Sequence, residues 1–254
     1  MTSDDAVERL RAAGCVFADE EARLIAEAAG ADAGTREALL RRRLAGEPLE
    51  VVVGWAEFAG LRIPVAPGVF VPRRRTELLA RLAIARTPRA GTVVDLCCGS
   101  GAIAAAVAHA RPDVTVIAAD IDPRAVALAS GTLAAYGATA VVSDMDGALG
   151  ALHGRVDLVA SCPPYVPSAR IALMPREARE HEPRIALDGG LDGADLQRES
   201  LAAAARLLGT GGVAVVETSE DLASLTLQMA EAAGLVAVVE RDADLGATAV
   251  VASR

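Results

Sequence analysis

The chain contains no lysine: its 25 basic residues are all arginine, and they face 34 acidic residues, so the formal net charge is −9. Without lysine, neither a Schiff base nor a Walker-type phosphate loop can form. The negative balance argues against non-specific binding to nucleic acid or to anionic membranes, which requires many cationic contacts. We therefore interpret Arg41-Arg42-Arg43 as a solvated helix end and not as a nucleic-acid patch.

Aromatic residues are also scarce, with one Trp, two Tyr and three Phe in 254 residues. Base stacking on an aromatic platform is therefore not expected, and the core must consist of Ala, Val, Leu and Ile. The four cysteines show no CxxC spacing and the three histidines lie far apart in the sequence. Neither a disulfide framework nor a metal site is predicted.

Long apolar runs are missing as well. No run reaches the roughly 18 residues that a membrane span requires. Residues 1–10 are polar and charged, without the apolar segment of a signal peptide. These features predict a cytoplasmic protein.

The hydrophobic pattern divides the chain into three parts. Residues 1–48 are expected to form a small N-terminal helical domain that recognises the substrate. Residues 49–75 are expected to form a β-hairpin and a linker, with Val51-Val52-Val53 in the first strand. Residues 76–254 should form the catalytic domain. The helices of the first part are predicted at 4–13, 18–29 and 35–45.

In the third part, near-continuous apolar strands alternate with helices, which predicts a parallel sheet buried on both faces. Only residues 242–246 join the last two strands, too few for a parallel crossover, so the final strand should be antiparallel. This α/β, Rossmann-like pattern is typical of a class I S-adenosylmethionine-dependent methyltransferase. Strands are predicted at 92–96, 114–119, 139–143, 156–161, 213–217, 235–241 and 247–253, helices at 77–85, 101–110, 123–136, 194–208 and 220–233, and a long loop at 163–193.

Gly99-Ser100-Gly101 follows the first strand of this sheet and opens a helix. Ligands of open α/β sheets bind at the carboxyl ends of the strands, where a helix N-terminus offers free N–H groups. Asp120 ends the next strand, and a carboxylate there can accept both hydroxyl hydrogens of a ribose. Because Gly99, Gly101 and Ala104 also satisfy a dinucleotide pattern, an NAD-dependent oxidoreductase remains an alternative at this point.

Three further residues favour S-adenosylmethionine. Asp95 lies at the strand end before the glycines, where it can take the ammonium of a methionine moiety but would repel a pyrophosphate. Asp144 ends the third strand and can accept from the adenine amino group, and Met145 can lie against the ring. The alternative is that these acids only cap the ends of strands.

The segment Cys162-Pro163-Pro164-Tyr165 follows the strand at 156–161. Together with the loops above, with Phe70 to Glu77 and with Glu182 to Gly190, it resembles the HemK/PrmC-type methyltransferases. These enzymes methylate the side-chain amide nitrogen of the glutamine in the Gly-Gly-Gln loop of peptide-chain release factors. The resemblance covers most of residues 48–254 and implies S-adenosylmethionine as cofactor and a protein partner, a release factor.

The residues and the resemblance together define a predicted site with no metal. A catalytic corner is expected at Cys162, Pro163 and Tyr165. Cofactor contacts are expected from Thr76, Asp95, Cys97, Cys98, Gly99, Ser100, Gly101, Asp120, Asp144, Met145 and Cys162. Substrate contacts are expected from Phe70, Arg73, Cys162, Pro163, Pro164, Tyr165 and Glu182.

The chemistry explains this corner. An amide nitrogen is a poor nucleophile because its lone pair is delocalised into the carbonyl, so a catalyst must orient it and accept from its two N–H bonds. In the family, an Asn side-chain oxygen and the backbone carbonyl of the first proline are taken to do this, and the prolines stiffen the loop. Tyr165 would then pack against the planar acceptor group.

This chain departs from the family at its most important position, because Cys162 replaces that Asn and the chain contains no Asn at all. A thiol is a weak acceptor, and losing one such contact costs about 2.7–4 kcal/mol in the transition state. Glutamine methylation should therefore be slowed. A different protein side chain, a small-molecule nitrogen, a thiolate nucleophile at Cys162 and a non-catalytic binding module are the alternatives.

Other departures lie nearby. Cys97 and Cys98 replace the usual Gly and Thr of the cofactor loop, and Arg74-Arg75 replace a Pro and an acid. Glu217 matches a family Glu, which is either functional or a structural hydrogen-bond acceptor.

Overall fold

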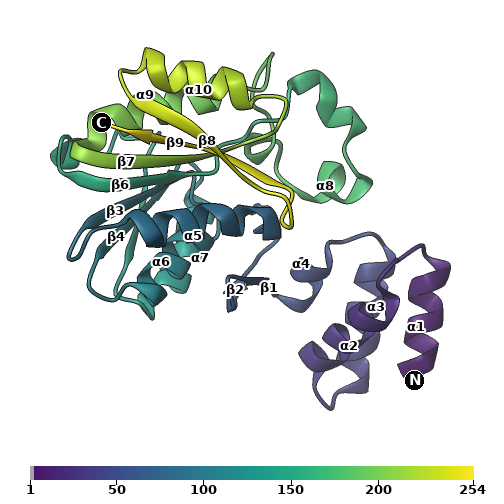
Figure 1. Cartoon of the computed structure of the whole chain (residues 1–254). Helices are drawn as coiled ribbons and strands as arrows, with labels where there is room; N and C mark the ends of the chain where they lie inside the picture. The colour runs from purple at the N-terminus through teal and green to yellow at the C-terminus, as the bar shows by residue number, and fades with distance from the viewer. Residues whose placement is uncertain (1–2) are drawn as a thin grey trace.

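The structure is a computed structural model, and it describes residues 3–254 (Figure 1). A small helical domain at the N-terminus is joined by a β-hairpin to a larger α/β domain. Among the described residues, no helix is both long enough and apolar enough to span a membrane.

The helical domain is held together by its own core, in which Leu10, Ile25 and Leu40 are fully buried. An alanine-rich α2 brings its apolar face against the neighbouring helices, while arginines and glutamates cover the outside. Its elements are α1 (Ser3–Ala12), α2 (Ala18–Ala29), α3 (Ala33–Leu44) and α4 (Leu49–Val53).

The predicted strand at Val51-Val52-Val53 is wrong, because these residues form the end of α4. Val52 is buried in the core of the helical domain, and this packing outweighs the preference of valine for strands. Gly54, with a φ of 89°, ends the helix. The hairpin follows it as β1 (Trp55–Phe58) and β2 (Leu61–Pro64).

The α/β domain is built on a seven-stranded sheet with the order β5-β4-β3-β6-β7-β9-β8. All neighbours are parallel from β5 to β7, whereas β9 runs antiparallel to both β7 and β8. This confirms the predicted antiparallel hairpin at the C-terminus. The strands are β3 (Thr92–Leu96), β4 (Thr115–Asp120), β5 (Thr139–Val142), β6 (Val156–Ser161), β7 (Leu208–Thr218), β8 (Val236–Asp242) and β9 (Ala247–Ser253).

Helices cover both faces of the sheet, as its continuous apolar strands require (Figure 1). Val93 points into the core beneath the first group of helices, and Val94 points into the core beneath the second. The first group is α5 (Glu77–Arg86), α6 (Ala102–Ala110) and α7 (Pro123–Ala134), and the second is α9 (Asp195–Leu207) and α10 (Ala223–Ala232).

The predicted loop at 163–193 contains short helices: η3 (Ser168–Leu173), α8 (Arg176–His181) and η4 (Arg184–Ala186). A single bridge between Val166 and Asp188 closes its base. It emerges beyond β6, next to the point where strand order reverses, since the chain runs from β3 to β4 and β5 on one side and to β6 and β7 on the other. Ligands of such sheets bind in the crevice at this point.

Candidate active site

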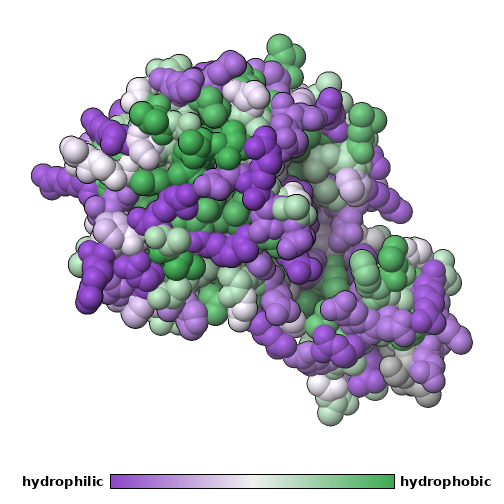
Figure 2. All heavy atoms as spheres, in the orientation of Figure 1, coloured by the Kyte–Doolittle hydropathy of each residue, from purple (hydrophilic) through white to green (hydrophobic). Residues whose placement is uncertain are grey.

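A cavity of about 1440 Å³ lies at this reversal point, between the carboxyl ends of the strands and the helical domain. Figure 2 shows a hollow between the larger body and the helical domain. The helical domain contributes Phe17, Leu24 and Arg43 to its walls, and the hairpin contributes Trp55 and Phe58. Single-ligand pockets are usually about 300–1,000 Å³, so this cavity has room for a cofactor and part of a second molecule.

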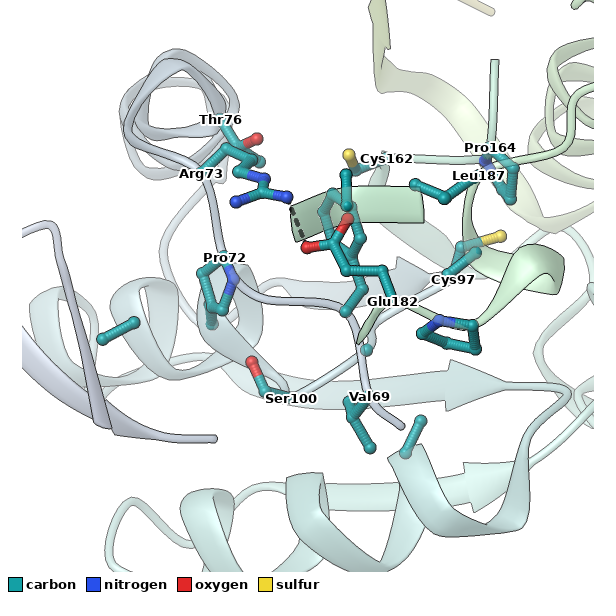
Figure 3. Close-up of a pocket in the computed structure, with 18 of the residues that line it drawn as sticks. Val69, Pro72, Arg73, Thr76, Cys97, Ser100, Cys162, Pro164, Glu182 and Leu187 are labelled. Atoms are coloured by element: carbon teal, nitrogen blue, oxygen red, sulfur yellow. Dashed lines mark hydrogen bonds and ion pairs between the residues drawn. The ribbon is translucent and has the colours of Figure 1, made fainter. Parts of the chain in front are cut away.

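The glycine loop between β3 and α6 forms one wall. Gly99 and Gly101 have φ angles of 54° and 79°, which side chains other than glycine rarely adopt. A Cβ on Gly101 would lie 3.1 Å from Cβ of Ala129 in α7, whereas one on Gly99 would meet nothing within 4 Å. Gly101 is therefore needed for helix packing, and Gly99 leaves the backbone open toward the cavity. Ser100 lines the same wall, and its buried Oγ has no hydrogen-bond partner (Figure 3).

Asp120 stands at the end of β4 and faces the cavity. Its Oδ2 accepts from the backbone N–H of Gly99 at 2.9 Å, and its Oδ1 accepts from that of Asp122 at 2.9 Å. These two bonds fix the carboxylate but leave lone pairs free, because a carboxylate offers about four acceptor positions. Burial raises the pKa of Asp120 above its ordinary value, and the backbone bonds oppose the shift. The remaining lone pairs fit a pair of ribose hydroxyls.

Asp144 and Met145 follow β5 and line the cavity beyond Asp120. Met145 has a φ of 45°, an uncommon value that is held in place by Ser143, whose hydroxyl donates to the Met145 carbonyl at 2.7 Å. Asp144 is exposed, so its carboxylate is free to accept from a ligand. The two residues are placed as an adenine site would require.

Asp95 lies deeper than predicted. It is fully buried and does not line the cavity, so it is not a direct wall of the cofactor site. Its Oδ2 accepts from the backbone N–H of Ala104 at 3.1 Å, while Oδ1 has no hydrogen-bond partner. An orphaned buried oxygen beneath the glycine loop fits a cationic group, reached directly or through a water molecule. Burial raises the pKa of Asp95 to about 7.

This buried carboxyl predicts how stability depends on pH. Between its ordinary value of 3.8 and about 7, the unfolded chain ionises Asp95 while the native protein keeps it neutral, so its contribution to stability is lost as the pH rises. The quantity to compare is the free energy of unfolding of Asp95→Asn minus that of wild type. This difference should be about 1–3 kcal/mol larger at pH 8 than at pH 5, because one pKa unit corresponds to roughly 1.4 kcal/mol. Urea unfolding of both proteins measures this difference. An equal offset at the two pH values would contradict a raised pKa.

Cys97 and Cys98 occupy the loop as predicted, but in different ways. Cys97 lines the cavity with a φ of 57°, which explains why glycine is usual at this position in the family. Cys98 is buried and packs in the core with α5 and α6. Burial raises the pKa of both thiols, that of Cys97 to about 12, and the carboxylates of Asp95 and Asp120 add to the shift. Both residues are therefore neutral thiols.

The backbone of Cys97 also predicts a stabilising substitution. A left-handed residue other than glycine costs about 1–2 kcal/mol. Replacing Cys97 by glycine removes this cost, but part of the gain in stability is offset because glycine has more conformational freedom in the unfolded chain. Cys97→Gly should raise the free energy of unfolding by roughly 0.5 kcal/mol, whereas Cys98→Gly, at a buried site, should lower it. Urea denaturation measures both variants. An equal decrease in the free energy of unfolding for Cys97→Gly and Cys98→Gly would show that the backbone of Cys97 is not strained.

The acceptor corner begins where β6 ends. Cys162 and Tyr165 are half-buried, Pro163 is buried, and all three residues line the cavity together with Pro164. Burial raises the pKa of the Cys162 thiol well above its ordinary value, and nearby Glu217 adds to the shift more than Arg75 opposes it. A thiolate nucleophile at Cys162 is therefore disfavoured.

A second network, which the sequence did not predict, supports this corner. Glu217 at the end of β7 accepts from the Tyr165 hydroxyl at 2.9 Å and from Nε of Arg75 at 3.3 Å. The Arg75 guanidinium lies 5.8 Å from the centre of the Tyr165 ring. Glu217 is nearly inaccessible, and its Oε2 has no hydrogen-bond partner. Both Arg75 and Glu217 were noted from the sequence as separate residues. The sequence contains no feature that predicted their contact.

The remaining predicted substrate residues meet on one wall of the cavity (Figure 3). Arg73 forms an ion pair with Glu182, and its guanidinium lies 5.1 Å from the centre of the Phe70 ring. Burial raises the pKa of Glu182, and Arg73 opposes this shift. Thr76, which was predicted as a cofactor contact, is buried beside Cys162, and its hydroxyl has no hydrogen-bond partner. The ion pair ties the segment before α5 to the segment after β6.

Comparisons with known proteins agree with this geometry. Residues 61–176 match the family model described as "Methyltransferase small domain". A solved structure of a T. thermophilus 16S rRNA N2 G1207 methyltransferase, in complex with AdoMet and guanosine, covers 79% of this chain and is itself covered to 49%, with 22% sequence identity and a TM-score of 0.56. At that identity the likeness shows the fold alone.

Several relatives share more sequence identity with this chain than that solved structure does. The release factor glutamine methyltransferase of Geobacter sulfurreducens is 40% identical over 75% of this chain and 67% of its own, and that of Moorella thermoacetica is 38% identical over 84% and 76%. A 4-amino-L-phenylalanine/4-methylamino-L-phenylalanine methyltransferase of Streptomyces pristinaespiralis is 42% identical over 73% and 66%. The chain belongs to the release factor glutamine methyltransferase family, and it is an S-adenosylmethionine-dependent methyltransferase.

Proposed function

We propose that this chain methylates the side-chain amide nitrogen of a glutamine in a protein, and that a peptide-chain release factor is the first substrate to test. The proposal rests on one observation: the Cys162–Tyr165 corner opens into the same cavity as the cofactor residues Gly99, Asp120 and Asp144. Its support is the family to which the chain belongs.

In this proposal the cofactor residues hold the donor across the tips of β3, β4 and β5. S-adenosylmethionine supplies a methyl group made electrophilic by its positive sulfonium. Asp120 accepts from the ribose, Asp144 accepts from the adenine amino group, and Asp95 offers negative charge beneath the methionine end. The residues fit this group because free acceptor positions occur at the end of each of these strands.

The acceptor residues then orient the nitrogen. The backbone carbonyl of Pro163 accepts one N–H bond of the amide, and the rigid Pro163-Pro164 pair fixes its direction. Tyr165, held by Glu217, packs against the planar amide. With the donor bound, transfer would form an N–C bond as the donor's S–C bond breaks, leaving S-adenosylhomocysteine, and the proton lost by the nitrogen would pass to water. Because alignment provides most of the rate, a fixed corner of this kind is what the reaction requires.

We assign substrate recognition to the helical domain. Phe17, Leu24 and Arg43 face the cavity opposite the acceptor corner. Phe17 is 69% exposed, an unusual state for a phenylalanine, and it is available to contact a protein segment that enters the cavity.

A second candidate acceptor is an amine on a small amino acid. Cys162 favours it, because an amine nitrogen is a stronger nucleophile than an amide nitrogen and depends less on a side-chain acceptor. The relative from S. pristinaespiralis, whose name specifies such an amine, is consistent with this candidate.

The test is methyl transfer from labelled S-adenosylmethionine to purified release factor, with the glutamine of its Gly-Gly-Gln loop replaced by alanine as the control. Label in the wild-type substrate alone supports the proposal. Label in 4-amino-L-phenylalanine and not in the release factor would favour the second candidate. Transfer to neither would overturn both.

A further inference from the structure

The two clearest departures from the family meet in space. The family resemblance implies an amide where Cys162 stands at the end of β6, and an acid where Arg75 stands in the turn η1 (Arg74–Thr76). Arg75 lies close enough to influence the Cys162 thiol, and both residues line the cavity. The corner has thus exchanged a group that accepts hydrogen bonds for one that only donates them.

Arg75 is held at one end and free at the other. Only its Nε is bonded, to Glu217, and among residues 3–254 neither terminal nitrogen makes a hydrogen bond. The side chain is 46% exposed and lines the cavity, so its unbonded nitrogens are accessible to a ligand there. Two parallel N–H donors on a guanidinium match a carboxylate, which they bind in bidentate fashion.

The arginines at this wall differ in their partners. Three arginines, Arg73, Arg74 and Arg75, follow one another at this wall. Glu182 pairs with the first and Glu217 with the third, while Arg74 is exposed and forms no ion pair among the described residues. Arg75 is therefore anchored beside the acceptor corner by its Nε, whereas no ion pair holds Arg74 there.

Topology places the Arg75 guanidinium on the acceptor side. Asp120 ends β4 and Asp144 follows β5, and both strands lie on one side of β3. Glu217, which anchors Arg75, lies at the end of β7, two strands away on the other side of β3. Its partner Tyr165 belongs to the acceptor corner. A carboxylate held by Arg75 lies beside the acceptor nitrogen and away from the adenosyl group.

We infer that Arg75 is a specificity-determining residue: its free guanidinium nitrogens bind a carboxylate of the substrate protein, contributed by an acidic residue next to the methylated glutamine. The inference rests on the proposed function and narrows its substrate class to acidic peptide segments. Binding the carboxylate holds the glutamine from a second direction. This contact compensates for the side-chain hydrogen bond that Cys162 does not provide.

The experiment uses blocked peptides of the form Gly-Gly-Gln-Gly-Gly, in which one glycine at a time is replaced by Asp or by its neutral isostere Asn. For at least one position, kcat/KM of the wild-type enzyme should be about 10-fold higher with Asp, since a charged carboxylate forms a stronger hydrogen bond with a guanidinium than a neutral amide does. Arg75→Gln should bring this ratio close to one. Arg74→Gln is the matched control: it removes the same charge one residue away and should keep most of the ratio.

Each result has a distinct meaning. Equal use of Asp and Asn peptides by the wild type overturns the inference, while their methylation supports the proposed function. A ratio that persists in Arg75→Gln, or falls equally in Arg74→Gln, also overturns it. If Arg75→Gln raises KM for S-adenosylmethionine and leaves the ratio intact, the guanidinium holds the donor's carboxylate and the inference is wrong.

No transfer to any peptide or to the release factor overturns the proposed function, and the inference falls with it. Arg75→Lys, which retains the charge, and thermal unfolding of each variant show whether a loss reflects recognition or folding.

Discussion

Cys162→Asn is expected to raise kcat/KM for a glutamine substrate by up to about 100-fold, since a well-placed hydrogen bond to the reacting group contributes about 2.7–4 kcal/mol in the transition state. The new side-chain oxygen would accept the amide N–H that the thiol accepts only weakly. The new amide nitrogen would also find acceptors, because Thr76 Oγ1 and Glu217 Oε2 are buried near Cys162 without hydrogen-bond partners. The measurement is steady-state methyl transfer to the peptides described above.

The control for this prediction is Cys162→Ala. If the thiol contributes little to orienting the substrate, the alanine variant should keep its rate within about 3-fold of wild type, and only the asparagine variant should gain. A rate for Cys162→Asn that stays at or below that of wild type would show that the physiological acceptor is not an amide. The same comparison with 4-amino-L-phenylalanine then tests the second candidate, for which the asparagine should bring no gain.

The regular part of the α/β domain could be predicted because its signals are local. Apolar strands such as Val156–Ser161, helices ended by glycine or proline, and the short connection between β8 and β9 each point to one structure. The exception is α4, where three successive valines favour a strand but Val52 packs into a helical core. That core depends on contacts with α2 and α3, which a local pattern does not contain.

The sequence predicts which site residues stand at strand ends, but not how deeply they are buried or which distant residues they contact. Gly99, Asp120, Asp144 and Cys162 stand at strand ends, and parallel strands bring their ends to the same edge. The depth of Asp95 was missed because one position in a strand can face either a cavity or the core. The bond between Arg75 and Glu217 was missed for a different reason. It joins residues 142 positions apart, on a turn and a strand that meet only in the folded chain.

Both sides of the cavity depart from the family pattern, but on the donor side the carboxylates are kept. Asp120 and Asp144 line the cavity as expected, whereas Cys162 and Arg75 alter the corner where the nitrogen must lie. Glu217 links the changed Arg75 to the retained Tyr165, so the new guanidinium is part of the network that positions the aromatic ring. Changes at Arg75 or Cys162 should therefore alter how the acceptor nitrogen is oriented more than how the donor is bound.

Donor binding provides the second large effect. Asp120→Ala is expected to weaken the binding of S-adenosylhomocysteine by about 100-fold or more, or roughly 2.7 kcal/mol, because two hydrogen bonds to a charged carboxylate are lost at about 1.5–3 kcal/mol each. Asp120→Asn should weaken it nearly as much. One of its two positions becomes a donor, and the backbone N–H groups of Gly99 and Asp122 compete for the remaining oxygen.

The matched control is Asp122→Asn. Asp122 lies two residues farther along and caps α7, and its carboxylate is already bonded to the backbone and side chain of Arg124. Because asparagine is also a good helix cap, this variant should bind within about 3-fold of wild type. Calorimetric titration with S-adenosylhomocysteine measures all three variants, and thermal unfolding establishes that each is folded. Loss of affinity in Asp122→Asn equal to that in Asp120→Asn would mean that the general negative charge of the loop binds the donor. A loss confined to position 120 would show that one carboxylate holds the ribose.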